Sequence, residues 1–368
     1  MRRFKRWAGS LAFRIGGGLW RITHPARPAQ GDPRSILVVN LLRIGDTVVT
    51  FPALESLRRR FPSARITLVV RTLVESLVRP LTCVDEVIAH DGDNSRLSCA
   101  RLEPKLPSAD LALVLDTSPW AILAARRRAR RVVAYDSLGM GFAATDRVEA
   151  PRVWNLPLRH YRPGDHAPYQ GDAWHALVER VGAQASFAIP VWTPPQADVQ
   201  EASRWLDGEG IHDGFVLLHP VSDPSYRWDV ARWHELGRRL KVPVVVGGGP
   251  ADSEIVSQVA SGIPGSRMFI SSSLARYGAL LSLARHVVSV DTSAAHLAAA
   301  VGTGLTVLFG PGDPRIWAPR GRASVGVVEA RSACVGCKRA RCFRPTHECM
   351  DSLHVDRVLS GLPRELQA

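Results

Sequence analysis

The stretch ILVVNLLRIGDTVVTFPALESLRRRFPSARITLVV, residues 36–70, decides the fold. It opens with Ile36–Asn40, an uninterrupted apolar run of the kind that buried parallel strands have. Residues 50–60 predict a helix with Pro52 in its first turn, where a proline costs no hydrogen bond. Ile66–Val70 predicts the next strand. A strand, a helix and a second strand in this order form a βαβ unit, so the stretch indicates a parallel sheet.

The same alternation continues along the chain in two halves, separated by the proline-rich residues 151–200. We therefore predict an α/β protein with two Rossmann-like domains facing a central cleft, where ligands bind at the carboxyl ends of the strands. The predicted segments are a basic arm and linker at 1–35, an N-terminal domain at 36–190, a C-terminal domain at 191–330 and a Cys-rich segment at 331–368. The last predicted strand is Thr306–Phe309.

Charge is distributed unevenly over the 368 residues, whose formal net charge is +13. The first 35 residues hold eight cations and one acid, so more than half of the excess belongs to this arm. A basic coat for nucleic acid is therefore not expected, although a nucleic-acid-binding protein is the alternative from another functional class. The run Arg126–Arg131 is interpreted as a solvated helix end, which the helix dipole favours.

The N-terminal arm has apolar residues at helical spacing, among arginines. Residues 1–30 predict either a helix that lies on the anionic inner-membrane surface or one that packs on the protein, and both interpretations stay open. The sequence has no run of about 18 apolar residues, so no membrane span is predicted. No signal peptide is evident. With six cysteines, this favours a reducing, cytoplasmic setting, peripheral at the inner membrane.

Four motifs follow predicted strands. Arg43-Ile44-Gly45-Asp46 comes after the first, and Asp46 is either a helix cap or a general base for an acceptor hydroxyl. Asp291-Thr292-Ser293 opens a helix with His296 in its first turn, where backbone N–H groups and the dipole attract phosphate. Residues 219–228 offer hydroxyls, Ser222 among them, and the guanidinium of Arg227 for a diphosphate. Residues 309–314, FGPGDP, predict a shaped loop.

These motifs make the chain resemble glycosyltransferase family 9, the heptosyltransferases of lipopolysaccharide core synthesis, from about Ile36 to Val358. The stretches that carry the resemblance are residues 41–70, VSVDTSAAHLAAAVGT at 288–303 and VLFGPGDP at 307–314. The resemblance implies a GT-B fold and inverting transfer from a nucleotide-sugar donor, most commonly ADP-heptose, to a glycolipid acceptor, without a metal for catalysis. Another donor sugar or a protein acceptor is the alternative within the family.

The resemblance also implies roles for individual residues. Asp46 matches the general base, and Asp291, Thr292, Ser293 and His296 match the segment that holds the donor. Ser222 and Arg227 are further candidates for donor binding, and Arg43 is the candidate for acceptor binding. Two departures stand out: Tyr226 occupies the position where the family usually has a lysine for the donor phosphate, and Ser293 replaces the usual glycine.

Four cysteines gather near the C-terminus, at Cys334, Cys337, Cys342 and Cys349. Four thiolates in sixteen positions predict a structural zinc or iron site, with free thiols as the alternative. Many members of the resembled family carry a similar segment.

Overall fold

Two parallel sheets of six strands form the protein, one in each of two compact units. The computed structural model describes residues 31–151, 169–184, 189–332, 337, 341–342, 344 and 346–368. Of these, residues up to 151 and 170–184 belong to unit 1, and Tyr169 and the residues from 189 onward belong to unit 2. The predicted α/β class with two doubly wound sheets is confirmed, and the predicted helix of residues 1–30 lies outside the described residues.

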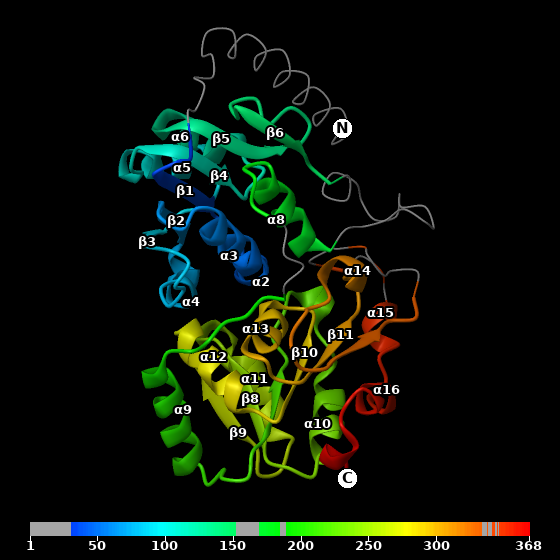
Figure 1. The fold of residues 1–368 in the computed structure, drawn as a ribbon. Coiled ribbons are helices and arrows are strands. Elements are labelled where there is room, and N and C mark those ends of the chain that lie inside the picture. Colours follow the sequence, from blue (N-terminus) through cyan, green and yellow to red (C-terminus); the bar gives the residue numbers. More distant parts are fainter. Residues whose placement is uncertain are drawn as a thin grey trace. The chain divides into compact units, whose positions relative to one another are not determined.

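Unit 1 has the strand order β3-β2-β1-β4-β5-β6. Its elements are β1 (Ser35–Asn40), α2 (Ile44–Val49), α3 (Phe51–Arg60), β2 (Arg65–Arg71), η1 (Thr72–Val74), α4 (Glu75–Val78), β3 (Glu86–His90), α5 (Arg96–Leu102), η2 (Glu103–Lys105), β4 (Ala109–Val114), α6 (Pro119–Arg128), β5 (Ala129–Asp136), β6 (Asp146–Glu149) and α8 (Gln170–Glu179). Figure 1 shows the helices of this unit around its sheet.

Unit 2 has the strand order β12-β11-β10-β7-β8-β9. Its elements are α9 (Gln196–Gly208), β7 (Val216–His219), η4 (Pro224–Tyr226), α10 (Val230–Arg238), β8 (Val244–Gly248), η5 (Pro250–Asp252), α11 (Ser253–Ser261), β9 (Arg267–Ile270), α12 (Leu274–Leu283), β10 (His286–Val290), α13 (Ser293–Val301), β11 (Leu305–Phe309), α14 (Pro314–Trp317), β12 (Val325–Glu329), α15 (Glu348–Asp351), α16 (Val355–Ser360) and η6 (Arg364–Leu366).

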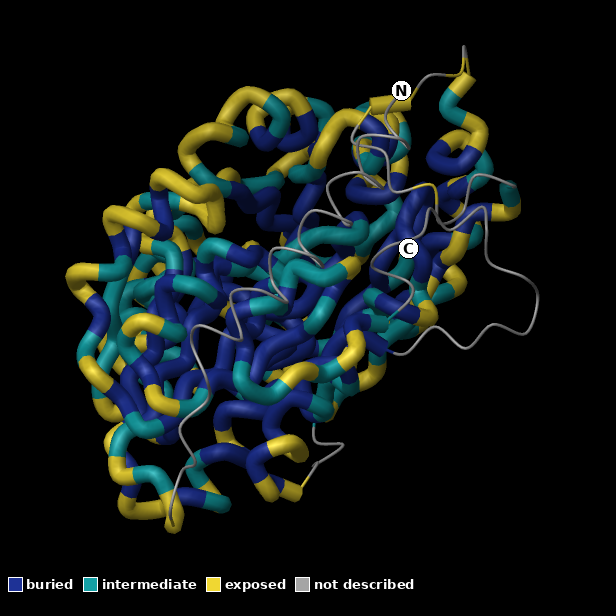
Figure 2. The backbone as a smooth tube through the Cα atoms, turned by 90° about the horizontal axis from the view of Figure 1, so that it is seen from above, coloured by how far each residue is buried: buried dark blue, intermediate teal, exposed yellow. Residues whose placement is uncertain are grey.

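The central strands are apolar throughout because both faces of each sheet are covered. In unit 1, Leu37 and Val39 of β1 pack with Leu102 of α5 and Ile122 of α6, while Ile36 and Val38, on the opposite face, are equally buried. Figure 2 shows buried residues in the interior and exposed residues along the outer turns. Among the described residues, no helix is long and apolar enough to cross a membrane.

Several predicted boundaries were wrong. Helix begins at Ile44 rather than at residue 50, so Asp46 lies inside it. Arg130 and Arg131 belong to β5, since the helix before them ends at Arg128. Strand β11 ends at Phe309, but it is not the last strand, because a further strand, β12, follows in the chain and pairs with it. The short strands β6 and β12 escaped prediction because their sequences, DRVE and VGVVE, contain charged residues or glycine and form no continuous apolar run.

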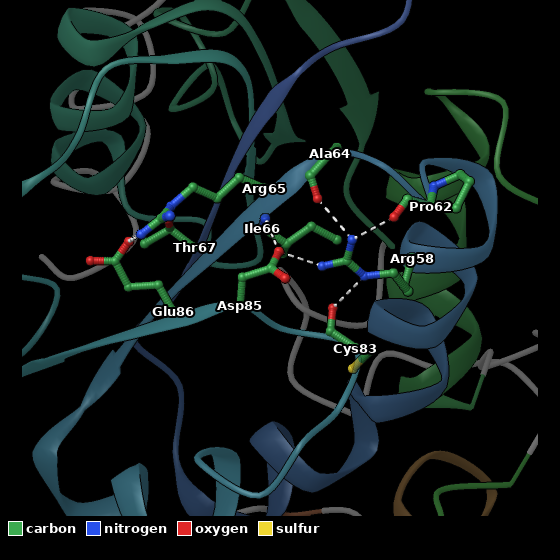
Figure 3. A network of polar contacts seen from close by, with 9 residues as sticks. All are labelled: Arg58, Pro62, Ala64, Arg65, Ile66, Thr67, Cys83, Asp85 and Glu86. Carbon is green, nitrogen blue, oxygen red and sulfur yellow. Dashed lines mark hydrogen bonds and ion pairs between the residues drawn. The ribbon is translucent and has the colours of Figure 1, made fainter.

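The amino edge of the unit 1 sheet is occupied by a structural polar network (Figure 3). The guanidinium of Arg58, near the end of α3, donates to the carbonyls of Cys83, Pro62 and Ala64 and pairs with Asp85. Asp85 also accepts a hydrogen bond from the Ile66 backbone N–H. These contacts hold α3 and the starts of β2 and β3 together. The charges of Arg58 and Asp85 neutralise each other within the fold.

Candidate active site

The carboxyl ends of the strands offer a place for ligands at one point in each sheet. In unit 1 the chain passes from β1 to β2 and β3 on one side, and β4, β5 and β6 follow on the other side of β1. The loops after β1 and β4 therefore diverge, and such a topological switch point is where doubly wound sheets bind ligands. Asp46 follows β1 in the first turn of α2, and Asp116 lies in the loop after β4.

Asp46 lies in the first turn of α2 and is partly buried. The helix begins at Ile44 with Arg43 in the N-cap position, so Asp46 is not the N-cap residue. The described residues supply no hydrogen bond to its carboxylate. Burial raises the pKa of Asp46, the cation of Arg43 opposes this shift and the negative charge of Asp116 adds to it, so that the pKa is about 6. A carboxylate of this kind is suited to accept a proton near neutral pH.

Asp116 was missed by the sequence reasoning. It follows β4 directly and is 4% exposed, and its carboxylate accepts hydrogen bonds from the Asn94 side chain at 2.7 Å and the Ser118 backbone N–H at 2.7 Å. Burial raises the pKa of Asp116, against the effect of these hydrogen bonds. The signal was present, because Asp116 ends the apolar run Leu111–Leu115 as Asp46 follows the apolar run Ile36–Asn40.

The switch point of unit 2 lies between β7 and β10. All six residues predicted to bind the donor come from the segments that follow these two strands. Ser222 and Arg227 follow β7, and Asp291, Thr292, Ser293 and His296 follow β10. The structure thus brings both predicted groups to the carboxyl end of adjacent strands, which pair in the register Ser289 opposite His219.

The segment after β7 is held in a fixed shape. Arg227 is exposed, and its Nε donates to the carbonyl of Ser222 at 3.1 Å, which leaves its terminal nitrogens for other partners. Trp228 is buried, donates from Nε1 to the carbonyl of Leu353 at 2.7 Å and stacks edge-on against Trp233. Burial raises the pKa of Tyr226, and the charge of Asp291 adds to that shift. The Tyr226 phenol therefore stays neutral.

Helix α13 begins directly after β10 with an open N-terminus. Thr292 takes the N-cap position but makes no side-chain capping hydrogen bond. The first backbone N–H groups of the nine-residue helix are therefore suited to an anion such as a phosphate. Gly312, in the loop after β11, lies against Asp291: a Cβ at position 312 would be 2.0 Å from Asp291 Oδ2. The loop thus approaches Asp291 as closely as only a glycine permits.

His296 is 7% exposed, and the described residues give its ring no hydrogen bond. Burial lowers the pKa of His296 to about 4, so the ring is neutral at pH 7. Below the same edge, His219 Nδ1 lies 2.6 Å from the hydroxyl of Tyr277, and both side chains are buried. The unit 2 site therefore combines neutral hydrogen-bonding groups and backbone N–H groups with an exposed guanidinium.

The predicted cysteine metal site finds no support in the described residues. Cys337 and Cys342 are exposed and Cys349 is buried, while Cys334 lies outside the described residues. Within the described part of the chain, no three His, Cys, Asp or Glu side chains are grouped in a way that fits a metal ion.

Two doubly wound units, one with a carboxylate of raised pKa and one with an open helix N-terminus suited to an anion, are the arrangement expected of a group-transfer enzyme that uses a nucleotide sugar. A family model described as glycosyltransferase family 9 (heptosyltransferase) matches residues 171–346. Lipopolysaccharide heptosyltransferase 1 of Pseudomonas aeruginosa is 27% identical over 90% of this chain and 92% of its own length. Lipopolysaccharide heptosyltransferase 3 of Escherichia coli is 24% identical over 75% of this chain and 83% of its own length.

Solved structures agree with the fold. A family 9 glycosyltransferase from Veillonella parvula superposes with a TM-score of 0.73 at 18% identity, over 91% of this chain and 97% of that one. The ADP-heptose lipopolysaccharide heptosyltransferase II of Escherichia coli superposes with a TM-score of 0.68 at 17% identity. The match covers 89% of this chain and 97% of that one. The match to the family 9 model, the similarity to lipopolysaccharide heptosyltransferases and the likeness to solved family 9 structures together support a glycosyltransferase of family 9 with the GT-B fold.

Proposed function

We propose that this enzyme transfers heptose from ADP-heptose to a lipopolysaccharide core or related glycolipid acceptor, with inversion at the anomeric carbon. The similarity to lipopolysaccharide heptosyltransferases over nine-tenths of the chain supports the substrate class. The observation that carries the mechanism is Asp46, a carboxylate of raised pKa with no hydrogen-bond partner among the described residues, at the switch point of unit 1.

In this proposal Asp46 is the general base. Its carboxylate takes the proton of the acceptor hydroxyl while the hydroxyl oxygen forms the new bond to the anomeric carbon. The bond between that carbon and the donor diphosphate breaks, and its electron pair leaves with the nucleoside diphosphate. A base with a pKa near 6 is ionised at pH 7 and still has a useful affinity for the proton.

The unit 2 site would hold the donor through this step. The open N-terminus of α13 supplies backbone N–H groups to the diphosphate, whose negative charge grows as the bond breaks. The terminal nitrogens of Arg227 add a cation. Ser222, Asp291, Thr292, Ser293 and His296 are proposed to contact the donor, and exposed Arg43, beside Asp46, to contact the acceptor. No metal has a role in this route, because neutralisation comes from N–H groups and arginine.

A donor screen tests this proposal. The purified enzyme is incubated with a heptose-free core acceptor and one donor: ADP-heptose, ADP-glucose, UDP-glucose or GDP-mannose. The mass of the product is then measured by mass spectrometry. We expect the mass increment of one heptose with ADP-heptose alone. Transfer of a hexose, or labelling of a protein acceptor, would replace the proposed substrate by the alternative within the family.

We also propose that the enzyme works at the cytoplasmic face of the inner membrane, attached through residues 1–30. The described chain begins at Gly31, beside a cavity of about 600 Å³ at the amino edge of the unit 1 sheet. Its lining includes four arginines, Arg34, Arg60, Arg130 and Arg131, and two acids, Asp32 and Asp110. Arg60 pairs with Asp32 and Arg131 with Asp146, so the cavity adds only a small positive charge to that of the arm. Each such cation near an anionic membrane contributes about 1 kcal/mol of attraction, weakened by salt.

Vesicle flotation tests the membrane attachment. The full chain should float with phosphatidylglycerol-containing vesicles at low salt and less at high salt, and a variant that lacks residues 1–30 should remain in the soluble fraction. Its transfer to a water-soluble acceptor analogue should be unchanged. Equal flotation of both forms would mean that the arm packs on the protein instead.

A structural metal at the four cysteines is a separate proposal, supported by the spacing of the cysteines and by the fold of a relative. An iron-containing dodecameric glycosyltransferase from enterotoxigenic Escherichia coli has the same fold, with a TM-score of 0.54 at 13% identity. Elemental analysis of the full chain, compared with a variant in which Cys334 and Cys337 are serine, tests it. Less than 0.1 metal ion per chain, after purification without chelators, would favour free thiols.

A further inference from the structure

A second carboxylate lies beside Asp46 at the switch point of unit 1. Strands β1 and β4 are neighbours, paired with Val39 opposite Val114. The pairing continues one residue further, because the Leu115 N–H donates to the carbonyl of Val39 at 2.9 Å. Asp116 is therefore level with Leu41, one strand away from the chain that turns into α2 and Asp46. Adjacent strands are about 4.8 Å apart, and the charge of Asp116 acts on the Asp46 carboxyl group in the first turn of α2.

The Asp116 carboxylate is fixed in place by its own hydrogen bonds. Asn94 Nδ2 donates to one oxygen and the Ser118 N–H donates to the other, each at 2.7 Å. The Ser118 hydroxyl in turn donates to the Asn94 carbonyl at 2.6 Å and accepts from the Trp120 N–H at the start of α6. Hydrogen bonds of this kind stabilise the ionised form of a carboxyl group. Asp116 is thus a buried side chain, 4% exposed, whose position is set by three segments.

Few charged groups act on this pair. Arg43 and Asp116 are the charged residues in the described part of the chain that influence proton binding at Asp46. Helices α3 and α8 and the turn η1 pack against α2, and burial lowers the pKa of His175 on α8, which keeps that ring neutral. Near Asp116, burial and the charges of Asp116 and Asp93 raise the pKa of the Cys99 thiol, so it stays uncharged.

We propose that Asp116 is a positioning residue for the transfer reaction: a fixed negative charge beside Asp46 that strengthens Asp46 as a proton acceptor. This inference rests on the proposed role of Asp46 as the base. When Asp46 takes the acceptor proton it becomes neutral, and the repulsion between the two carboxylates disappears. Like charges at close range favour the form in which one of them is protonated. Asp116 itself takes no proton from the substrate.

The Asp116→Asn variant tests this role, because asparagine keeps the shape and removes the charge. A flip of the Asn94 amide lets its oxygen accept from the new amide, so the hydrogen bonds can be kept. We expect the Asp46 carboxyl resonance, followed by ¹³C NMR, to titrate roughly 1 pH unit lower than in the wild type. The acid limb of the kcat/KM profile should move by the same amount, with a lower plateau because the base is weaker.

Two further variants make the test specific. Asp110→Asn applies the same change at the other end of β4, roughly 20 Å away, and should leave the Asp46 titration unchanged. Asn94→Ala keeps the Asp116 carboxylate but removes one of its donors, so Asp116 holds its charge less well. It should move the Asp46 titration in the same direction by less, and it keeps the test available if Asp116→Asn does not fold.

The outcomes distinguish the proposed role of Asp116 from the proposed role of Asp46. An unchanged Asp46 titration in a folded Asp116→Asn or Asn94→Ala variant overturns the role of Asp116. A loss of kcat without movement of the acid limb also overturns it, because a merely structural residue would act in this way. If instead Asp46→Asn is active, the proposed base is wrong, while the NMR titration still measures the coupling between the carboxylates.

Discussion

The two units of this protein share one architecture and carry opposite chemistry at the same topological position. In unit 1 the segments after β1 and β4 place two acids, Asp46 and Asp116, at the switch point, and burial raises the pKa of both. In unit 2 the segments after β7 and β10 place an open helix N-terminus, an exposed arginine and buried His296 there. One site is suited to accept a proton, and the other to bind an anion.

The difference shows which part of the design the fold supplies. Strand order alone creates a switch point in each sheet, whatever residues follow the strands. The chemistry comes from a few side chains in those segments and from their burial. Burial favours the uncharged form of every group, so it makes the acids of unit 1 better bases and keeps His296 of unit 2 neutral.

The largest expected effect is on catalysis in unit 1. Asp46→Asn should lower kcat by roughly 100- to 10,000-fold, because the shape is kept and the proton acceptor is lost. Donor affinity, measured by calorimetry with ADP-heptose, should stay within twofold, since the residues proposed to bind the donor lie in unit 2. Activity within a few-fold of the wild type would remove Asp46 from the mechanism and end the contrast between the units.

The same substitution should stabilise the protein at high pH. Unfolded Asp46 ionises near 3.8 and folded Asp46 near 6, so wild-type stability falls as the pH rises through this window. Asparagine has no charge to bury, and its advantage should reach roughly 3 kcal/mol above pH 7 and vanish near pH 4. Urea unfolding at pH 4 and pH 8 measures this. Asp93→Asn is the control: hydrogen bonds from Ser95 lower the pKa of Asp93, so no stabilisation is expected.

Donor binding in unit 2 should depend on Arg227 more than on Tyr226. A lost charge-assisted contact to phosphate costs roughly 1.5–3 kcal/mol, whereas the Tyr226 phenol is a weaker phosphate partner. Arg227→Ala should therefore weaken ADP-heptose binding well beyond Tyr226→Phe, with Arg227→Lys in between. Equal or reversed effects in donor titrations would assign the family's lysine role to Tyr226.

The smallest expected effect concerns the loop after β11. In Gly312→Ala the new Cβ would overlap Asp291 Oδ2, so either the loop or the Asp291 side chain must move. Such overpacking costs roughly 1–3 kcal/mol, and we expect it as weaker donor binding with little change in kcat. Gly208→Ala, at the last residue of α9 with nothing within 4 Å of its Cβ, serves as a control for expression and folding. Unchanged donor affinity in Gly312→Ala would show that Asp291 is not held in place for the donor.

Most of the fold could be predicted because the central strands are buried on both faces and read as apolar runs. Strands β6 and β12 could not be predicted, since their partly exposed sequences, DRVE and VGVVE, form no apolar run. The motif segments of unit 2 were predicted because each comes soon after an apolar strand. Asp116 also follows a strand, but its importance depends on Asn94, 22 positions away, and on β1, which comes long before it in the chain. No local pattern reveals such partners.

The sequence by itself determined the two parallel sheets and the resemblance to family 9, because apolar runs and strand-to-helix turns are local features. Only the tertiary structure decided which carboxylates become neighbours and how strongly each side chain binds a proton. The order β3-β2-β1-β4-β5-β6 places the ends of β1 and β4 side by side, although more than 70 residues separate them in the chain. Proton affinity depends on burial and on nearby charges, which exist only once distant segments have packed together.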